Sequence, residues 1–399
     1  MRTLNAALLL AFVLTLVPAP ALAAPAPTPA AGDPLCLPPA FGTAADCQPL
    51  GSYGYFQRLS DMGMSLPLRP LDAQLIDPAM AELPISYAIV NTSDSTGIVQ
   101  RPVFATLQDA VAYTTPRSYV KYGASPHYVT YSGFQQVDGT SYYLTNLGWM
   151  RRSDLSPVEV RRFGMGMLFD TAPTRPFGWV LEHSAGEAAP FPTYSSPSLQ
   201  APRSPGTLAA YSVIEVFEIQ QVADLQWYLV GPDQWLNSLQ MRLVHPMTEA
   251  PAGVEGGRWI EINLEQQSLA VYENNQLIFA TLIATGLDNL WTRPGLFQVY
   301  EKHDTTAMSG DFSGGTGGYY YLADVPWTMY YDQARAIHGA YWRQKQFFGY
   351  QGSHGCVNLA IGDARWVYEW ANIGDWVYVH DPSGRTPTDD EFQYSEGGA

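Results

Sequence analysis

A repeated pattern in the middle of the chain limits what this region can fold into. The runs Gln135-Gln136-Val137, Tyr142-Tyr143-Leu144 and Trp149 recur as Gln220-Gln221-Val222, Trp227-Tyr228-Leu229 and Trp235. The offset is 85 residues, and it becomes 86 at the tryptophan. In both copies, β-branched and aromatic runs alternate with polar or Gly/Pro turns, as in short β-strands. The pattern therefore predicts two copies of one small β unit, at residues 85–160 and 176–246.

The order of an aromatic-Tyr-Leu strand, a turn and a tryptophan strand resembles bacterial SH3-like small barrels. The resemblance implies two such barrels in tandem, which could hold wall polymer on exposed aromatic rings. The other interpretation is that Tyr142, Trp149, Trp227 and Trp235 pack in the core or between domains. We favour the core interpretation, because large aromatic side chains usually serve to bury area.

A second pattern lies further along the chain, where a single cysteine stands among histidine and glycine residues. Residues 353–358 read Ser-His-Gly-Cys-Val-Asn, and fourteen residues separate Ser353 from His338. A thiolate is a good nucleophile, and a nearby histidine can lower the pKa of the thiol and later return its proton. Gly355 permits a sharp turn, so that the N–H groups of Gly355 and Cys356 can point at a developing oxyanion. These are the parts of an acyl-transfer enzyme.

His338, the gap and the Ser-His-Gly-Cys-Val-Asn run resemble the signature of the L,D-transpeptidases, the YkuD-type enzymes that cross-link cell walls. The resemblance continues upstream in residues 259–273, Thr285-Gly286 and 292–295, where Arg293 replaces the commoner proline. It covers about residues 255–381. It implies a mainly β chain, with a YkuD-type β-sandwich and one short helix after the nucleophile, preceded by the two SH3-like barrels.

The resemblance also assigns roles to residues of the signature. Cys356 is expected to be the nucleophile, and His338 the general base and acid, with its ring steered by the carbonyl of Gly339. His354 has two possible roles: it shapes the oxyanion pocket with the Gly355 and Cys356 amides, or it is a hydrogen-bonded scaffold residue.

Other residues near the signature are expected to support the loop or to contact substrate. Ser353 and Asn358 are expected to hold the loop rigid through hydrogen bonds to nearby backbone. The candidate substrate contacts are Met308, Tyr341, Trp342 and Arg343. The basic side chain of Arg343 could bind stem-peptide carboxylates. For Arg343 we favour the alternative, a solvated loop charge, and some of the aromatic residues are expected in the core.

The implied function is L,D-transpeptidation in peptidoglycan biosynthesis, with effects on cell-wall organisation and cell shape. The Cys356 thiolate would attack the third residue of a stem peptide, release the terminal D-Ala and pass the acyl group to the amine of a second stem peptide. The implied partners are stem peptides as donor and acceptor, the cell wall, and a carbapenem as a covalent inhibitor. Three alternatives stay open: an L,D-carboxypeptidase in which water takes the acyl group, a wall-binding protein with a vestigial catalytic domain, and a thiol peptidase with another substrate.

A zinc site is the rival interpretation of the same residues. Zinc takes four ligands in structural sites, or three and a water in catalytic ones. The region offers His338, His354 and Cys356, while His303 and His380 are remote in sequence, and no C-x-x-C or H-E-x-x-H motif is present. We therefore expect no metal and no cofactor.

The first residues of the sequence predict export. Arg2 precedes an apolar run at 6–17, and Ala21-Leu22-Ala23 fits a small-residue cleavage site, so residues 1–23 are predicted to be a signal peptide. The run is shorter than the ~20 residues of a membrane-spanning helix, which favours cleavage over anchoring. The mature protein is expected to be extracytoplasmic, either periplasmic or associated with the cell wall.

The three cysteines and the net charge add two further expectations. Cys36 and Cys47 lie close together, and we predict a disulfide between them with Cys356 free. The formal net charge is −16, and it becomes −17 once the signal peptide with Arg2 is removed. A surface this acidic repels nucleic acid, so no nucleic-acid partner is expected.

Expectations for the remaining segments complete the domain plan. Residues 24–84 form a Pro-rich N-terminal segment, 161–175 and 246–257 mark boundaries, 309–320 form a loop or lid edge, 361–371 a helix, 375–379 the closing strand, and 382–399 a disordered acidic tail. Because the signature lies wholly within 255–381, we expect that the two repeats are not needed for the chemistry.

Overall fold

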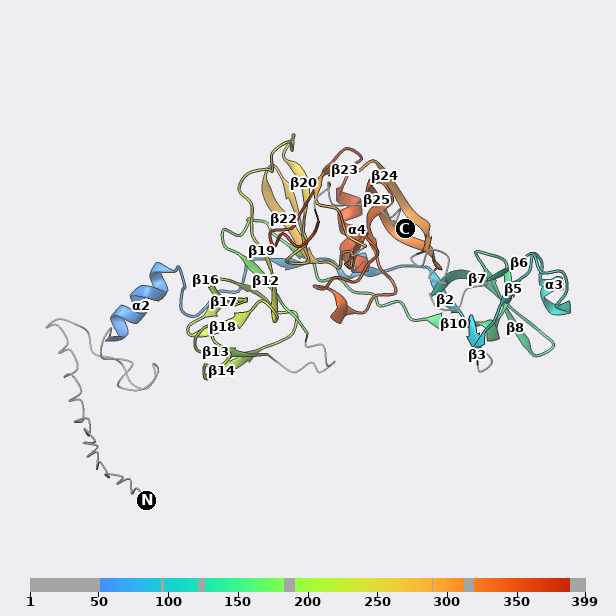
Figure 1. Cartoon of the computed structure of the whole chain (residues 1–399), viewed down its shortest axis with the longest axis horizontal. Coiled ribbons are helices and arrows are strands. Elements are labelled where there is room, and N and C mark those ends of the chain that lie inside the picture. Colours follow the sequence, from blue (N-terminus) through green and yellow to red (C-terminus); the bar gives the residue numbers. More distant parts are fainter. Residues whose placement is uncertain are drawn as a thin grey trace, which may run out of the picture. The chain divides into compact units, whose positions relative to one another are not determined.

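The computed structural model describes residues 51–94, 97–120, 126–182, 191–288, 290–311 and 319–387 (Figure 1). Contacts divide the chain into two units, Met1–Gly63 and Met64–Ala399. In the first unit the described part is a helix, α2 (Gly51–Asp61), where the sequence shows no clear period. The predicted signal peptide, Cys36 and Cys47, and residues 388–399 lie outside the described residues. No helix within the described ranges is both long and apolar enough to cross a membrane.

One layer of the second unit is a seven-stranded sheet with the order β1-β11-β22-β21-β20-β28-β23. Its strands are β1 (Gln74–Leu75), β11 (Met167–Leu168), β20 (Arg258–Asn263), β21 (Ser268–Glu273), β22 (Gln276–Leu282), β23 (Gly295–Gln298) and β28 (Trp376–His380). Asn274 and Asn275 both have positive φ in the hairpin turn between β21 and β22, a conformation that asparagine adopts more readily than most residues. β1 lies in the predicted Pro-rich N-terminal segment and β11 in the predicted boundary 161–175, yet both are strands of this sheet.

The other layer is a nine-stranded sheet with the order β10-β2-β7-β25-β26-β27, in which β24 pairs with β25 and β8 joins β7 and β9. Its strands are β2 (Ser86–Val90), β7 (His127–Val137), β8 (Thr140–Thr145), β9 (Trp149–Arg151), β10 (Leu155–Val158), β24 (Glu301–Asp311), β25 (Tyr319–Asp332), β26 (Arg335–Gly339) and β27 (Val357–Leu359). The described ends of the predicted 309–320 loop are therefore strand residues.

The strands β7 and β25 come from the first repeat and from the region that carries the Cys356 signature, yet they pair in parallel. Tyr321 lies opposite His127, and Leu322 lies opposite Tyr128. The first repeat is thus part of the same sheet as the strands that carry the signature. The two regions cannot be treated as separate bodies joined by a linker.

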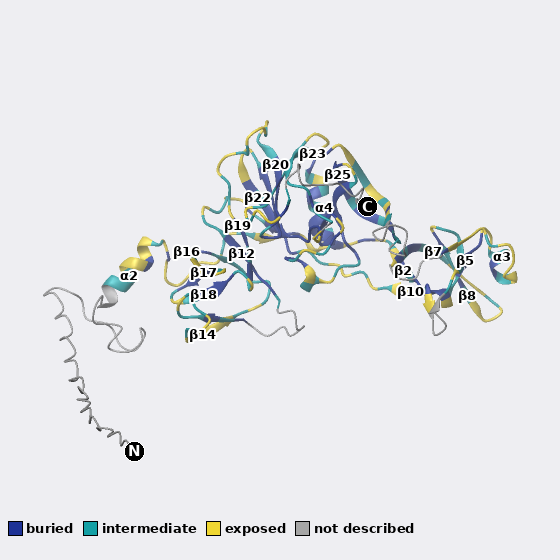
Figure 2. Ribbon diagram, viewed as in Figure 1, coloured by how far each residue is buried: buried dark blue, intermediate teal, exposed yellow. Residues whose placement is uncertain are grey.

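A single core joins the two layers. It includes Ile260 and Val377 from the seven-stranded sheet, Met329 and Ile337 from the nine-stranded sheet, and Val367 from α4 (Ile361–Trp370), all with no exposed surface. Figure 2 shows this buried centre around β20, β22, β25 and α4. Alternating apolar residues on the strands supply it, as period-two patterning requires.

A buried carboxylate also fixes the segment that follows the first repeat. Asp363 of α4 is fully buried and accepts hydrogen bonds from the backbone N–H groups of Met165 and Gly166 and from the Thr281 hydroxyl. A buried carboxylate needs such partners. Met165 and Gly166, within the predicted boundary 161–175, are therefore folded against α4.

The first repeat adds smaller elements around its own core. These are β3 (Ser93–Asp94), β4 (Gly97–Ile98), β5 (Arg101–Val103), α3 (Leu107–Ala112), β6 (Ser118–Val120) and the 3-10 turn η2 (Arg152–Asp154). The Thr106 hydroxyl caps α3 by accepting from the Asp109 N–H at 3.1 Å. Ala88, Val103, Val129 and Met150 have no exposed surface and form the centre of this core.

The second repeat has two antiparallel sheets. One has the order β15-β12-β19 and the other β14-β13-β18-β17-β16. The strands are β12 (Phe177–Val180), β13 (Phe191–Tyr194), β14 (Arg203–Leu208), β15 (Val213–Glu215), β16 (Glu218–Val222), β17 (Leu225–Gly231), β18 (Gln234–Asn237) and β19 (Met241–Val244). Val180, Tyr228 and Leu236 are fully buried in a core of its own.

The sequence repeat corresponds to a repeated antiparallel meander. Gln135 pairs with Tyr142 and Gln220 with Trp227, while Leu144 pairs with Trp149 and Leu229 with Trp235. Tyr142, Trp227 and Trp235 are 3, 1 and 6% exposed, which confirms the core interpretation for these three, and Trp149 is half-buried. The SH3-like class of the repeats stays a prediction.

The described part of the predicted acidic tail is ordered. The Asp381 carboxylate accepts hydrogen bonds from the N–H groups of Ser383 and Thr386, at 3.0 and 2.8 Å. Thr386 is only 7% exposed. The boundary at residue 382 is therefore too early.

Candidate active site

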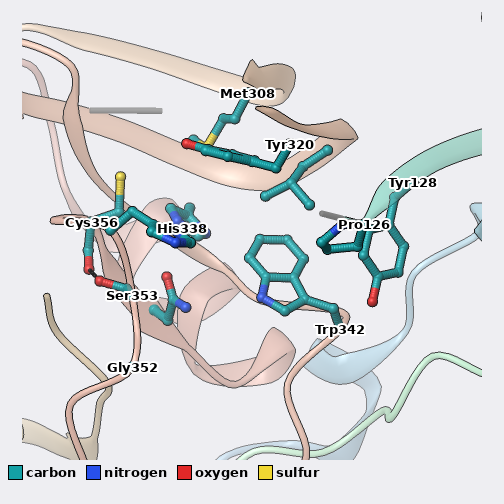
Figure 3. Close-up of a pocket in the computed structure, with 12 residues that line it drawn as sticks. Pro126, Tyr128, Met308, Tyr320, His338, Trp342, Gly352, Ser353 and Cys356 are labelled. Atoms are coloured by element: carbon teal, nitrogen blue, oxygen red, sulfur yellow. Dashed lines mark hydrogen bonds between the residues drawn. The ribbon is translucent and has the colours of Figure 1, made fainter. Parts of the chain in front are cut away.

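Two parallel strands bring the signature residues together. β26 and β27 pair so that Ile337 lies opposite Val357 and His338 opposite Asn358. Side chains alternate along a strand, so Cys356, Asn358 and His338 share one face. All three line a cavity of about 220 Å³, which is drawn in Figure 3. The other lining residues are Pro126, Tyr128, Met308, Tyr320, Leu322, Trp342, Gly352, Ser353 and His354.

Ser353 folds the loop that presents Cys356. Its hydroxyl donates to the carbonyl of Cys356 at 2.5 Å and accepts from the N–H of Gly355 at 3.2 Å. Gly355 has φ +115°, a conformation that other residues rarely adopt. Ser353 therefore holds the loop, as the sequence predicts. However, the Gly355 N–H is hydrogen-bonded inside the loop, whereas the sequence analysis assigns it to an oxyanion.

Two segments upstream in the sequence, Thr285-Gly286 and residues 292–295, hold the same loop through hydrogen bonds. The Thr292 hydroxyl donates to the carbonyl of Gly355 at 2.8 Å and accepts from the Gly286 N–H at 2.9 Å. The carbonyl of Thr285 accepts from the N–H of Ser353 at 3.0 Å. A Cβ at Gly286 would lie 2.0 Å from the carbonyl oxygen of Leu290, so only glycine fits there. These turns therefore position the loop that presents Cys356.

Arg293, which stands where proline is commoner, braces the turn through an ion pair. Its Nε lies 3.0 Å from Oδ2 of Asp332, a side chain that is 2% exposed. The guanidinium of Arg335 contacts the same carboxylate at 3.3 Å. Pairing with two cations satisfies this buried charge. In this chain, an ion pair between Arg293 and β25 therefore takes the place of the rigid proline ring.

His338 is held in one tautomer. Its Nδ1 lies 3.2 Å from the carbonyl oxygen of Gly339, and because a carbonyl can only accept, Nδ1 carries the hydrogen. Nε2 is then the acceptor atom of the neutral ring. Burial lowers the pKa of His338 to about 4, opposed by the Gly339 hydrogen bond and assisted by the charge of Arg343. The ring is 2% exposed and neutral near pH 7, as a general base must be.

Cys356 is a buried residue, 5% exposed, directly before β27. Its Sγ donates to the carbonyl of Ala334 at 3.8 Å, which describes the protonated form. A thiol becomes an effective nucleophile once a base removes this proton. A neutral imidazole in the same cavity is such a base, so the arrangement is suited to nucleophilic acyl transfer.

His354 stands at the exposed rim of the cavity. Its ring stacks on Tyr320, with centroids 5.2 Å apart and planes inclined by 14°. Burial of its inner edge and the charge of Arg343 lower the pKa of His354 to about 4. Met308 of β24 is 1% exposed and lines the same cavity. Of the four candidate substrate contacts, Met308 and Trp342 line the cavity.

Tyr341 and Arg343 have supporting positions instead. Tyr341 is 1% exposed, stacks on Tyr87 at 3.7 Å and donates its hydroxyl to the carbonyl of Ala323. Arg343 donates to the backbone carbonyls of Phe347 and Gly352 around the turn η3 (Lys345–Phe347). Burial lowers the pKa of Arg343 to about 10. The half-buried guanidinium therefore braces its loop, and neither predicted role, carboxylate binder or solvated charge, describes it.

The sequence analysis missed the cavity residues contributed by β7 and by the start of β25. Pro126 and Tyr128 come from the first repeat, and Tyr320 and Leu322 come from β25. The strand pattern around Tyr128 predicts a strand but not its partner. Within the described ranges, no three His, Cys, Asp or Glu side chains gather in a way that could hold a metal ion.

Comparison with known proteins gives one consistent family for the C-terminal region. A family model described as the L,D-transpeptidase catalytic domain (YkuD) matches residues 257–379. The chain is 30% identical over 122 residues to the Bacillus subtilis (strain 168) protein named "Putative L,D-transpeptidase YciB", covering 28% of this chain and 59% of that relative. The chain thus spans somewhat over half of the curated relative that it matches.

Solved structures with similarity to the chain carry the same family name. An L,D-transpeptidase from Stackebrandtia nassauensis is 27% identical, covers 32% of this chain and 57% of its own, and has a TM-score of 0.25. The catalytic domain of the E. faecium L,D-transpeptidase, solved acylated by ertapenem, is 25% identical, covers 32% of this chain and all of its own, and has a TM-score of 0.29.

Proposed function

We propose, from the premise that residues 257–379 form an L,D-transpeptidase catalytic domain, that this protein cross-links peptidoglycan stem peptides through a thioester on Cys356. One observation carries the proposal: a buried thiol and a neutral histidine, whose Nδ1 is hydrogen-bonded to Gly339, share one cavity. The tautomer of His338 is fixed by Gly339, so the base points its lone pair away from that carbonyl. Nucleophile and base then act without a carboxylate partner.

In the first half-reaction, Nε2 of His338 takes the proton of the Cys356 thiol. The thiolate attacks the carbonyl carbon of the third stem residue, and the C–N bond to the terminal D-Ala breaks. His338 gives its proton to the departing amine. In the second half-reaction, the amine of another stem peptide attacks the thioester, its proton passes to Nε2, and the thiol is restored.

The oxyanion of each step needs hydrogen-bond donors, and we assign the backbone N–H groups of Gly355 and Cys356 to this role. The Gly355 N–H donates to the Ser353 hydroxyl at 3.2 Å in the resting loop. In our proposal this bond is exchanged for one to the oxyanion, which is a stronger acceptor because it is charged. His354 at the rim is assigned to supporting the loop through its stacking on Tyr320.

An L,D-carboxypeptidase is the second candidate function, because the rim residues Pro126 and His354 are exposed to solvent and water can reach the thioester. The same thiol is proposed to attack the strained carbonyl of a carbapenem. The cell wall and its stem peptides are the proposed partners, and the predicted signal peptide would bring the mature protein to them. The predicted Cys36–Cys47 disulfide belongs to this exported form.

A reporter assay on the purified mature protein tests the proposal. With a soluble tetrapeptide stem, we expect release of D-Ala and a product joined from two stems, or a shortened stem if water wins. Cys356→Ala should abolish all of these while leaving the melting temperature within a few degrees, since removing a buried thiol leaves only a small cavity. Turnover above a few per cent in Cys356→Ala would refute the assignment. Binding to cell walls without D-Ala release would favour the vestigial alternative.

A further inference from the structure

The cavity that holds Cys356 is not built by the catalytic region alone. Pro126 and Tyr128 of the first repeat form part of its wall. Figure 3 places Cys356 at one end and Pro126 and Tyr128 at the other, with His338 and Trp342 between them. The first repeat therefore reaches the active site on the side of His338 that is remote from the thiol.

Aromatic rings connect this end of the cavity to the base. The ring of Trp342 lies 5.7 Å from the ring of His338, and the ring of Tyr128 lies 6.3 Å from that of Trp342. Tyr128 also meets Tyr341 edge to face at 5.5 Å. Tyr128 and Trp342 are half-buried, so each ring keeps an exposed part. The rings form a wall that runs outward from His338.

Hydrogen bonds hold the wall in register with the catalytic sheet. The Thr130 hydroxyl donates to the Asp324 carboxylate, and the Tyr87 hydroxyl donates to the Asp324 carbonyl at 2.7 Å. Asn146 donates to the Tyr321 hydroxyl at 2.8 Å. Together with the pairing of β7 and β25, these bonds fix Tyr128 relative to His338. Such support is what a binding wall requires.

We infer that Tyr128, with Trp342, contacts the acyl acceptor and so sets whether the thioester is cross-linked or hydrolysed. This inference rests on the proposed function. The attacking amine must reach both the thioester carbon and Nε2 of His338, so the rest of the acceptor extends beyond His338. The wall of Trp342 and Tyr128 lies there.

The chemistry of the wall fits the acceptor. The acceptor amine ends an aliphatic chain of a diamino acid, whose methylene groups can lie against flat aromatic and proline faces. No Asp, Glu, Lys or Arg is among the residues that line the cavity. An apolar lining without a carboxylate favours the uncharged amine, which is the nucleophilic form. A water molecule makes no comparable apolar contact with these rings. The wall therefore favours attack by the bound amine over attack by water.

The test separates the two half-reactions in the full-length protein. Thioester formation is followed by intact mass after mixing with a donor stem alone, and partition is followed by the ratio of cross-linked to hydrolysed product against acceptor concentration. The variants are Tyr128→Ala and Tyr128→Leu, which remove the ring, and Tyr128→Phe, which keeps it. Phe134→Ala is the matched control, because Phe134 lies on the same strand, is 54% exposed and is not among the cavity residues.

We expect Tyr128→Ala and Tyr128→Leu to form the thioester within about twofold of the wild-type rate. They should need about tenfold more acceptor than the wild type to give the same ratio of cross-linked to hydrolysed product. This factor corresponds to the loss of one aromatic contact. Tyr128→Phe and Phe134→Ala should partition like the wild type. Unchanged partition in Tyr128→Leu, or equal slowing of both half-reactions, would overturn the inference. A wild-type protein that forms no thioester would instead overturn the proposed function, and this inference with it.

Discussion

The two repeats share a meander but differ in what their strands do next. In the first repeat, β7 has 11 residues, and its beginning pairs with β25 of the catalytic sheet. In the second, β16 has 5 residues, pairs only with β17 and is the edge strand of its sheet. The repeated residues therefore encode the meander, and residues outside the repeated pattern, such as His127 and Tyr128, encode the attachment to the active site.

The second repeat meets the catalytic region elsewhere. The Leu243 N–H donates to Gln266 Oε1 at 3.0 Å, and the Ser268 hydroxyl donates to the Leu243 carbonyl at 2.8 Å. Arg242 donates from Nε to the Gly349 carbonyl at 2.9 Å. None of these residues lines the cavity of Cys356. One copy of the unit thus lines the cavity of Cys356, while these contacts of the other copy lie outside that cavity.

Removing the imidazole of His338 is expected to have the largest effect on activity. His338→Ala should lower acyl transfer by about 100- to 10,000-fold, the usual contribution of a general base. His380→Ala is the matched control, since His380 bonds Glu261 on a neighbouring strand and does not line the cavity. The measurement is the rate of Cys356 alkylation against pH. Superimposable profiles for His338→Ala and wild type would remove His338 from this role.

The next effect is the pH dependence of activity and of stability that the buried His338 produces. Burial holds the pKa of His338 at about 4, so activity should persist at pH 5, where a histidine of ordinary pKa would be only about 3% neutral. The unfolded chain takes up a proton near pH 6.5 and the folded chain does not. The free energy of unfolding should therefore fall as the pH drops from about 6.5 to 4, by at most about 3 kcal/mol from this residue. Urea titrations of wild type and His338→Asn test it, and equal pH dependence would contradict the assignment.

A smaller effect compares the two junctions. Thr130→Val removes the hydroxyl that donates to Asp324 and should weaken the position of Tyr128. We expect about a threefold loss in acceptor efficiency, in line with about 0.7 kcal/mol from part of one hydrogen bond. Ser268→Ala removes one hydrogen bond at the second repeat's junction and should leave acceptor efficiency unchanged. Equal losses of acceptor efficiency in the two variants would mean that both repeats affect the reaction only through the stability of the fold.

The smallest expected effect on activity comes from the core of the second repeat. Trp235 is 6% exposed in that unit, and Trp235→Ala should lower its stability by about 3–5 kcal/mol. Turnover of a soluble stem peptide by the still-folded fraction should stay within about twofold. Proteolysis and thermal unfolding report the stability loss, and D-Ala release reports activity. A tenfold drop in activity at a temperature where the variant is folded would show that the second repeat also serves the site.

The sequence predicts the parts of the site that lie close together in the chain or on one pair of strands. The 353–358 run and His338 meet because β26 and β27 are neighbours, and the Thr285 and Thr292 turns clamp the same loop. The Asn-rich hairpin follows from turn chemistry. The helix α4 begins at Ile361, where helical spacing of apolar residues is also seen in the sequence.

The wall formed by Tyr128 could not be predicted, because it depends on a long-range strand pairing. Thr130 and Asp324, which bridge that pairing, are 194 positions apart. The β-branched and aromatic run at 128–131 predicts a strand, but the run does not indicate which strand it pairs with. The places of β1 and β11 in the seven-stranded sheet could not be predicted either, because they too depend on long-range pairing. Arg343 was misjudged because spacing does not reveal the direction of a long side chain in a loop.

The most direct test of the account maps the thioester itself. The full-length protein is mixed with a tetrapeptide stem, quenched in acid and digested at low pH, and the peptide containing Cys356 is weighed. We predict a gain equal to a stem that has lost its terminal D-Ala, confined to Cys356, absent in Cys356→Ala and removed when acceptor amine is added. Release of D-Ala without any adduct on Cys356 would contradict the central claim that this thiol carries the acyl group.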